Sequence, residues 1–280
     1  MSELRDRRHF DDSSAREIQL PAGDVTEGVV RVGDTVRRPH QSQSYAVAAY
    51  LDHLQRASFD GSPRYLGRDR LGRDVLTFVE GDVAGAVIDD RFLGDDLLAS
   101  VGHLVRRLHD ASAGYLARDE PFPRRIGAED QPEIISHLDV TPQNVVVRDG
   151  RAFALIDFDL AGPTSKFRDS YNAAMHWVPL LHPTDVRTDV ELGDQLRRLR
   201  VFADAYGWSA DERASLPRFG ADAAARSWDR MRERAASEGG GWARMWNEGV
   251  GDIIRRRGEW LLANEAAIVR ALGSPEASED

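Results

Sequence analysis

Hydrophobic and polar positions change their spacing near residue 80 of this 280-residue chain. Before that point, short apolar runs flank turn dipeptides, which predicts antiparallel hairpins over residues 28–38 and 64–79. Between them, apolar residues recur at helical spacing and predict a helix over residues 44–57. Residues 1–17 are polar and are expected to form a poorly ordered arm.

After residue 80 the spacing becomes helical. A long helix is predicted from Asp95, with one apolar stripe of leucine and valine side chains. Four later segments carry the same periodicity: residues 167–181, 192–206, 221–236 and 252–272. The sequence therefore predicts an α+β fold with two lobes, a small antiparallel β-rich lobe at residues 1–80 and a larger, mainly helical lobe at residues 81–280.

A third hairpin is predicted inside the helical part. The dipeptide Asp149-Gly150 lies between two apolar runs, and this is a strong signal for a two-residue type I′ turn. With a two-residue loop, Asn144 would pair with Leu155, and Pro142 would pair with Asp157. Directly opposed residues share a face of a hairpin, and so do residues two apart. Asn144 and Asp157 should therefore lie at the same end and on the same face.

Polar oxygen atoms gather at that predicted end. Asp139 lies just upstream of the hairpin, in a loop that Pro142 keeps out of helix. Together with Asn144 and Asp157, it offers two carboxylates and an amide oxygen. Hard oxygen ligands of this kind suit Mg²⁺. The spacing therefore predicts a magnesium site.

The same residues match a known pair of motifs. His137 and Asp139, followed by Asn144, have the H-x-D-x-x-x-x-N spacing of kinase catalytic loops. Ile156-Asp157-Phe158 stands where those enzymes carry a metal-binding D-F-G segment. The short interval between the motifs, and Asp159 in place of glycine, resemble the aminoglycoside phosphotransferase and choline kinase group of small-molecule kinases.

The resemblance implies a bilobal, protein-kinase-like fold and an enzyme that uses ATP or GTP with Mg²⁺ to phosphorylate a hydroxyl group of a small polar molecule. It implies that Asp139 is the catalytic carboxylate that orients the hydroxyl, and that Asn144 and Asp157 hold the metal. Plainer alternatives stand beside these roles. Asp139 could cap a turn before Thr141-Pro142, and Asn144 could be a turn residue that opens a strand.

The nucleotide would be bound by a second group of residues. Residues 77–81 resemble the kinase hinge, where the backbone of Phe78, Val79 and Glu80 would meet the adenine edge. Val146 and Ile156 are the candidate apolar contacts of the base. An ordinary strand end followed by a turn also explains the hinge segment, and core packing also explains Val146.

Three features depart from the family. The third strand carries no lysine, so Arg37 takes the place of the residue that contacts the phosphates. The helix over residues 44–57 holds no glutamate to pair with it, and residues 21–28 lack a G-x-G-x-x-G pattern. A kinase-like binding protein with little or no catalysis is therefore the alternative function. A metal-dependent hydrolase is disfavoured, because only His137 is near the two carboxylates.

The composition of the chain argues against some classes of binding partner. A net charge of −10 argues against a general nucleic-acid binder, and no apolar run is long enough to span a membrane. The charged N-terminus has no apolar signal segment, which favours a cytoplasmic protein. The absence of cysteine excludes disulfides and thiolate catalysis. Acidic and aromatic residues of the helical lobe could bind a cationic acceptor, although solvated helix faces and core packing explain them as well: Asp185, Asp189, Glu191, Asp194, Trp177, Trp242 and Trp246.

Overall fold

The computed structural model describes residues 9–10, 16–20, 28–84, 90–115, 122, 132–186 and 191–273. The chain forms two compact units. The first unit contains residues 1–86, 107–124 and 129–166. The second unit contains residues 87–106, 125–128 and 167–280.

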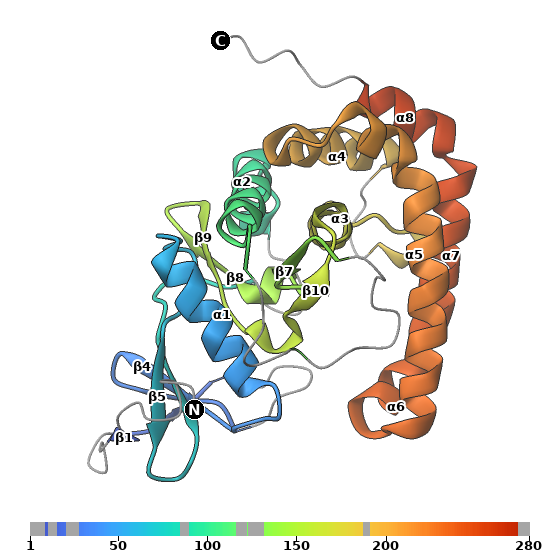
Figure 1. Ribbon diagram of the computed structural model, residues 1–280. Coiled ribbons are helices and arrows are strands. Elements are labelled where there is room, and N and C mark those ends of the chain that lie inside the picture. The colour runs from blue at the N-terminus through green and yellow to red at the C-terminus, as the bar shows by residue number, and fades with distance from the viewer. Residues whose placement is uncertain are drawn as a thin grey trace, which may run out of the picture. The chain divides into compact units, whose positions relative to one another are not determined.

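A six-stranded sheet in the order β1-β5-β6-β4-β3-β2 is the largest element of the first unit (Figure 1). Its neighbours pair antiparallel, except that β1 and β5 are parallel. The two hairpins predicted at residues 28–38 and 64–79 are both present in it. The strands are β1 (His9–Phe10), β2 (Ile18–Gln19), β3 (Val30–Val32), β4 (Thr35–Arg38), β5 (Tyr65–Asp69) and β6 (Asp74–Thr77).

Helix α1 (Ser44–Arg56) packs its apolar stripe on one face of this sheet. Val47 and Leu51 of the helix line a pocket together with Tyr65 of β5 and Leu76 of β6. Leu51 and Leu54 are almost fully buried, as the helical spacing predicts.

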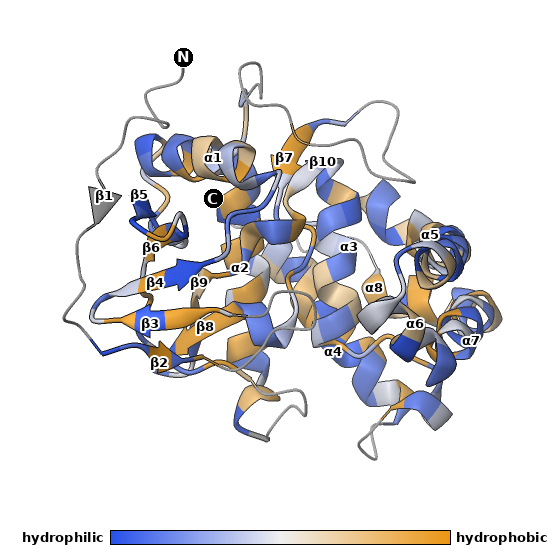
Figure 2. Cartoon of the chain, turned by 90° about the horizontal axis from the view of Figure 1, so that it is seen from below, coloured by the Kyte–Doolittle hydropathy of each residue, from blue (hydrophilic) through white to orange (hydrophobic). Residues whose placement is uncertain are grey.

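Four short strands complete the first unit. β7 (Ile134–Ser136) pairs with β10 (Gly162–Thr164), and β8 (Val145–Arg148) pairs with β9 (Arg151–Leu155), both antiparallel. Figure 2 shows β3 and β8 in mostly hydrophobic colours, in agreement with the burial of their valines. Two 3₁₀ turns, η3 (Pro142–Asn144) and η4 (Phe158–Leu160), flank the β8–β9 hairpin.

The second unit is helical, and α5 and α7 lie side by side in it (Figure 1). The α+β fold class is confirmed. None of the described helices is long and apolar enough to cross a membrane. The helices are α2 (Asp95–Ala111, whose last residues belong to the first unit), α3 (Lys166–Trp177), α4 (Leu192–Tyr206), α5 (Ala210–Ser237), α6 (Gly240–Asn247), α7 (Val250–Ala263) and α8 (Glu265–Leu272), with 3₁₀ turns η2 (Asp90–Phe92) and η5 (Pro183–Asp185).

Several helices differ from the predicted ranges. α3 ends at Trp177, before residue 181, and the predicted segment 252–272 forms two helices, α7 and α8, which Asn264 separates. α5 begins at Ala210, well before residue 221, because Ser209 and Glu212 form a capping box and the helix continues through Pro217. α6 starts at Gly240, directly after Gly239, which has a positive φ of 66°. Glycines that were expected only to separate two helices thus also begin a short helix between them.

A half-buried histidine makes the stability of the second unit depend on pH. Burial, together with the positive charge of Arg257, lowers the pKa of His176 on α3 to about 4. As the pH falls below the ordinary histidine pKa of about 6.5, the unfolded chain takes up a proton that the folded chain refuses. We therefore expect the free energy of unfolding to fall by roughly 2–3 kcal/mol between about pH 6.5 and pH 4.

Urea unfolding at several pH values checks this expectation. His176→Gln should flatten the pH dependence in that window, because it removes the titrating group. His103→Gln, at an exposed position on α2, controls for the loss of an imidazole. An unchanged slope in the His176 variant would contradict the assignment.

Candidate active site

The loop after β7 is fixed by a buried histidine. The backbone N–H of Asp139 donates to His137 Nδ1 at 3.2 Å, and His137 Nε2 lies 2.9 Å from the carbonyl oxygen of Ile156. A carbonyl can only accept, so Nε2 carries the proton, and the imidazole is neutral because Nδ1 accepts. His137 thus joins Asp139 to the residue that precedes Asp157. The contacts of His137 are therefore structural, since they hold the loop.

Asn144 is bonded directly to Asp139. Its Nδ2 donates to Asp139 Oδ2 at 2.8 Å and to the Asp139 carbonyl at 3.0 Å. The 3₁₀ turn η3 places it there, since the Asn144 N–H donates to the Thr141 carbonyl at 2.9 Å. With Nδ2 facing Asp139, Oδ1 is the amide atom that could ligate a metal.

The β8–β9 hairpin has the predicted turn but not the predicted register. Asp149 and Gly150 both have positive φ, 50° and 73°, as a type I′ turn requires. A bulge then leaves Phe153 without a cross-strand partner, so Val145 pairs with Leu155. The predicted pairing of Asn144 with Leu155 is wrong: the Ile156 N–H donates to the Asn144 carbonyl at 2.9 Å.

The predicted pairing of Pro142 with Asp157 is wrong as well. Pro142 opens the 3₁₀ turn η3 instead of extending β8. Asp157 follows the end of β9 in a left-handed conformation, with φ 61° and ψ 66°. Aspartate tolerates this region better than most residues, and such backbone is frequent at functional sites.

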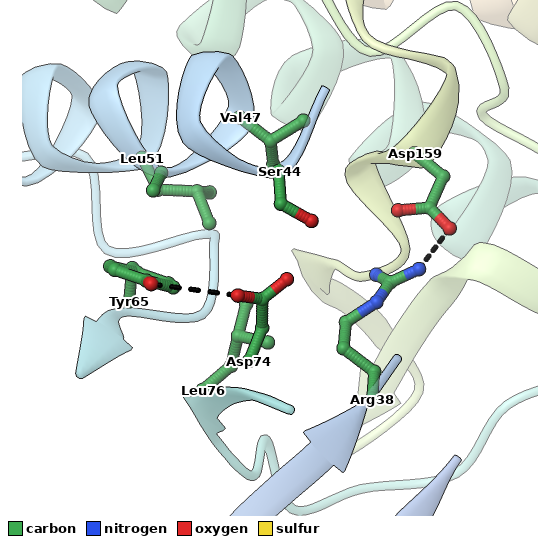
Figure 3. Close-up of a pocket in the computed structure, with 9 residues that line it drawn as sticks. Arg38, Ser44, Val47, Leu51, Tyr65, Asp74, Leu76 and Asp159 are labelled. Carbon is green, nitrogen blue, oxygen red and sulfur yellow. Dashed lines mark hydrogen bonds and ion pairs between the residues drawn. The ribbon is translucent and has the colours of Figure 1, made fainter. Parts of the chain in front are cut away.

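Arg38 of β4 binds two carboxylates next to this hairpin. Its Nη2 donates to Asp159 Oδ2, and its Nη1 lies 3.4 Å from Asp157 Oδ1. Figure 3 shows the contact with Asp159 beside the pocket that lies between α1 and the sheet. Gln41 Nε2 also donates to Asp159 Oδ2, at 3.4 Å.

Arg37, the predicted phosphate contact, lies elsewhere. Successive residues of a strand point to opposite faces, so Arg37 and Arg38 diverge. Arg37 is buried, with Nη1 donating to Thr35 Oγ1 and Nε 3.9 Å from Asp69 Oδ2. Phosphate binding by Arg37 stays a prediction, and this placement does not favour it. The structure brings Arg38, which the sequence did not single out, to Asp157.

Phe158 connects α1 to the loop that carries His137 and Asp139. Its ring packs edge-on against His137, with centroids 4.4 Å apart, and against Tyr50 of α1 at 6.1 Å. The Tyr50 hydroxyl donates to the Ile135 carbonyl at 2.9 Å. A buried aromatic group therefore fixes the turn that carries Asp157.

The predicted hinge residues contact β8 and β3. Glu80 accepts a hydrogen bond from Arg148 Nε at its carbonyl (2.6 Å), and its carboxylate pairs with Arg31 at 2.5 Å. The Arg31 guanidinium also stacks on the Phe78 ring at 3.8 Å. Val79, which lies between Phe78 and Glu80 in the sequence, is half-buried. The side chains of Phe78 and Glu80 are thus engaged within the first unit.

Gly81 brings this segment close to Val146. A Cβ at position 81 would lie 2.5 Å from Val146 Cγ1, and φ is +142°. Val146 is buried, and Ile156 is half-buried at the end of β9. Of the predicted nucleotide contacts, the hinge and Val146 therefore lie together, while Ile156 adjoins Asp157.

The side chains of Asp157 and Asn144 carry oxygen donors of the kind that Mg²⁺ takes from proteins. Among the described residues there is no group of three or more His, Cys, Asp or Glu side chains arranged for a metal. Mg²⁺ commonly takes only one or two carboxylates from a protein and completes its shell with phosphate and water. Asp157 and the amide of Asn144 match that requirement, and the Arg38 guanidinium shows that a cation is stable beside Asp157.

The chain resembles one characterised bacterial protein along most of its length. Over 211 residues it is 31% identical to the trifolitoxin immunity protein of Rhizobium leguminosarum bv. trifolii, covering 71% of this chain and 77% of that protein. The chain belongs to the trifolitoxin immunity protein family. A scan against protein-family models found no match.

Solved structures show which fold this member of the trifolitoxin immunity protein family has. A choline/ethanolamine kinase family protein from Mesorhizobium loti matches with a TM-score of 0.60, 16% identity and 93% coverage of each chain. The amicoumacin kinase hAmiN, in complex with AMP-PNP, Ca²⁺ and Ami, matches with a TM-score of 0.57 and 9% identity, covering 92% of this chain and 90% of that chain. A gentamicin–APH(2″)-IIa complex gives 0.52 and 11% identity over 92% of each chain. The predicted aminoglycoside phosphotransferase and choline kinase fold is confirmed.

Of the acidic residues considered for a cationic acceptor, Asp185 is engaged in an ion pair within the second unit. Asp185 forms a bidentate ion pair with Arg256, in which Nη2 lies 2.5 Å from Oδ1 and Nε lies 2.8 Å from Oδ2. Hydrogen bonding from Arg256 lowers the pKa of Asp185. Trp177 is buried, and Trp246 packs against Trp228. Asp189 lies outside the described residues. A cationic acceptor therefore stays a prediction.

Proposed function

We propose that the protein is a Mg²⁺-dependent phosphotransferase that moves the γ-phosphoryl group of ATP or GTP to a hydroxyl group of a small molecule. The observation that carries the proposal is the position of Asn144. Its amide is bonded to Asp139, and its carbonyl is bonded to Ile156, the residue next to Asp157. Asn144 thus links the proposed hydroxyl-orienting carboxylate, through its side chain, to the residue before the proposed metal ligand, through its backbone carbonyl.

Each residue has a distinct role in this proposal. Asp139 accepts the proton of the acceptor hydroxyl while the hydroxyl oxygen bonds to the γ-phosphorus and the nucleoside diphosphate leaves. Asn144 and Asp157 hold Mg²⁺, which supplies positive charge to the phosphate oxygens when bound. His137 keeps Asp139 in place through its neutral imidazole. The hinge backbone at Phe78, Val79 and Glu80, with Val146 and Ile156, would receive the base.

The relative and the fold support one class of acceptor. The relative is called an immunity protein, and the neighbouring structures include kinases crystallised with gentamicin or Ami. We propose that the acceptor is a growth-inhibiting small molecule with a free hydroxyl, which phosphorylation inactivates. Protection of a cell by this route would take place in the cytoplasm, where the nucleotide is.

A binding protein without turnover is the second candidate function. The contact of Arg38 with Asp157 favours it, since a cation of the chain itself already lies against the expected metal ligand. Such a protein would protect by holding the inhibitor instead of modifying it.

Transfer of labelled phosphate separates the two candidates. The wild-type protein is incubated with γ-labelled ATP or GTP and a panel of hydroxyl-bearing inhibitors, with Mg²⁺ or with EDTA. We expect a labelled product that requires both Mg²⁺ and an acceptor. Thermal stabilisation by Mg²⁺–nucleotide without any product would favour the binding protein, and a protein that no nucleotide stabilises would contradict the phosphotransferase.

A further inference from the structure

One arginine of the first unit holds both carboxylates that flank Phe158. Arg38 donates to Asp159 and lies 3.4 Å from Asp157. The side chains of Arg38 and Asp159 are only 12% and 16% exposed, whereas that of Asp157 is 37% exposed. An ion pair is stronger where water is excluded. Arg38 is therefore held firmly by Asp159 and weakly by Asp157.

The guanidinium of Arg38 is shared by the two carboxylates. Asp157 is the carboxylate that can exchange its partner, because its contact is longer and more exposed. Arg38 and Asp159 both line the adjoining pocket between α1 and the sheet, whose cavity volume is about 20 Å³ (Figure 3).

We propose that Arg38 competes with the divalent metal for Asp157, and that Asp159 positions Arg38 to contact the nucleotide phosphates. The phosphate half rests on the whole proposed function, whereas the competition rests only on the proposed metal site at Asp157. When a metal binds Asp157, the ion pair with Asp159 keeps the Arg38 guanidinium next to the metal site. Asp159 thus provides the acidic partner that α1, which has no glutamate, does not.

Binding of Mn²⁺ alone, followed by electron paramagnetic resonance, tests the competition without nucleotide or acceptor. Arg38→Met removes the competing cation and should tighten Mn²⁺ binding by roughly threefold or more, the effect of about one ion pair. Arg37→Met, the matched variant on the same strand, should leave the Mn²⁺ affinity unchanged, because Arg37 faces Asp69. Arg38→Lys keeps the charge and should bind Mn²⁺ like the wild type, which also controls for a variant that folds poorly.

Asp159→Asn should have the opposite effect on Mn²⁺. It frees Arg38 to pair fully with Asp157, so the Mn²⁺ affinity should fall about threefold. In the presence of Mg²⁺, both Arg38→Met and Asp159→Asn should weaken nucleotide binding by about tenfold, since each removes or misplaces the phosphate contact. If Asp159 acts through Arg38, the double variant should bind nucleotide no worse than Arg38→Met.

The outcomes separate this inference from the proposed function. Opposite shifts of the Mn²⁺ affinity in Arg38→Met and Asp159→Asn support the competition even if no acceptor is ever phosphorylated. Equal Mn²⁺ affinities in the wild type, Arg38→Met and Asp159→Asn would overturn it, as would a wild type that binds no Mn²⁺. Additive losses of nucleotide affinity in the double variant would overturn the positioning role of Asp159.

Discussion

Replacing Asp139 with asparagine is expected to lower the rate of phosphoryl transfer by roughly 10²- to 10⁴-fold, the usual contribution of a positioned proton acceptor. Asparagine has the shape of aspartate, and its Oδ1 can still accept the hydrogen bond from Asn144 Nδ2. The loop and the nucleotide affinity should therefore change little. The measurement is steady-state transfer of labelled phosphate to the acceptor, with nucleotide binding determined in parallel.

Asp149→Asn is the matched control for this prediction. Asp149 lies in the turn of the same hairpin, is exposed and has a φ of 50°, which asparagine also tolerates. The control should transfer phosphate like the wild type. An Asp139→Asn protein that retains more than about a tenth of the wild-type rate would show that Asp139 is not the proton acceptor.

The sequence predicted the hairpin at this site well but not the fine register of its strands. Asp149-Gly150 determines the turn, because both residues must adopt positive φ. The bulge at Phe153 has no comparable local signal, because a run of apolar residues can slip by one position without losing its hydrophobic character. Asn144 and Asp157 were expected at the same end of the hairpin, in agreement with the hydrogen bond between Asn144 and Ile156. The cross-strand partners predicted for the two residues were wrong.

The choice between two adjacent arginines was likewise beyond the sequence. Arg37 and Arg38 differ only in the face of β4 that they occupy, and both faces of this strand carry polar residues. The position of each arginine side chain depends on a carboxylate from a distant segment of the chain. Asp69 pairs with Arg37, and Asp159 pairs with Arg38. Although burial raises it, hydrogen bonding from Arg73 lowers the pKa of Asp69, so this carboxylate stays charged opposite Arg37.

Helices with a clear apolar stripe were predicted most accurately. α4 has the predicted bounds, residues 192–206, and α2 buries the predicted stripe. α5 was predicted too short, since proline at position 217 reads as a helix breaker. The capping box at Ser209 was the signal that could have located its start.

Gly81→Ala is expected to destabilise the first unit by roughly 4 kcal/mol, as the sum of backbone strain and a steric clash. The φ of +142° is accessible to glycine but strained for alanine. The added Cβ would lie 2.5 Å from Val146 Cγ1 and 2.7 Å from the Val147 carbonyl oxygen. That carbonyl cannot move away easily, because it accepts from the Asp82 N–H at 3.0 Å and the Val147 N–H donates back to Asp82 at 2.7 Å.

Gly150→Ala separates the strain from the clash. Gly150 also has a positive φ, 73°, but nothing lies within 4 Å of the position that its Cβ would take. We expect this control to lose only about 1 kcal/mol in urea unfolding, the cost of a left-handed alanine. Equal losses in the two variants would mean that the contact with β8 does not matter. A larger loss in Gly81→Ala, together with weaker nucleotide binding, would show that close packing of the hinge on β8 shapes the proposed base site, because the same glycine keeps Glu80 and Val146 together.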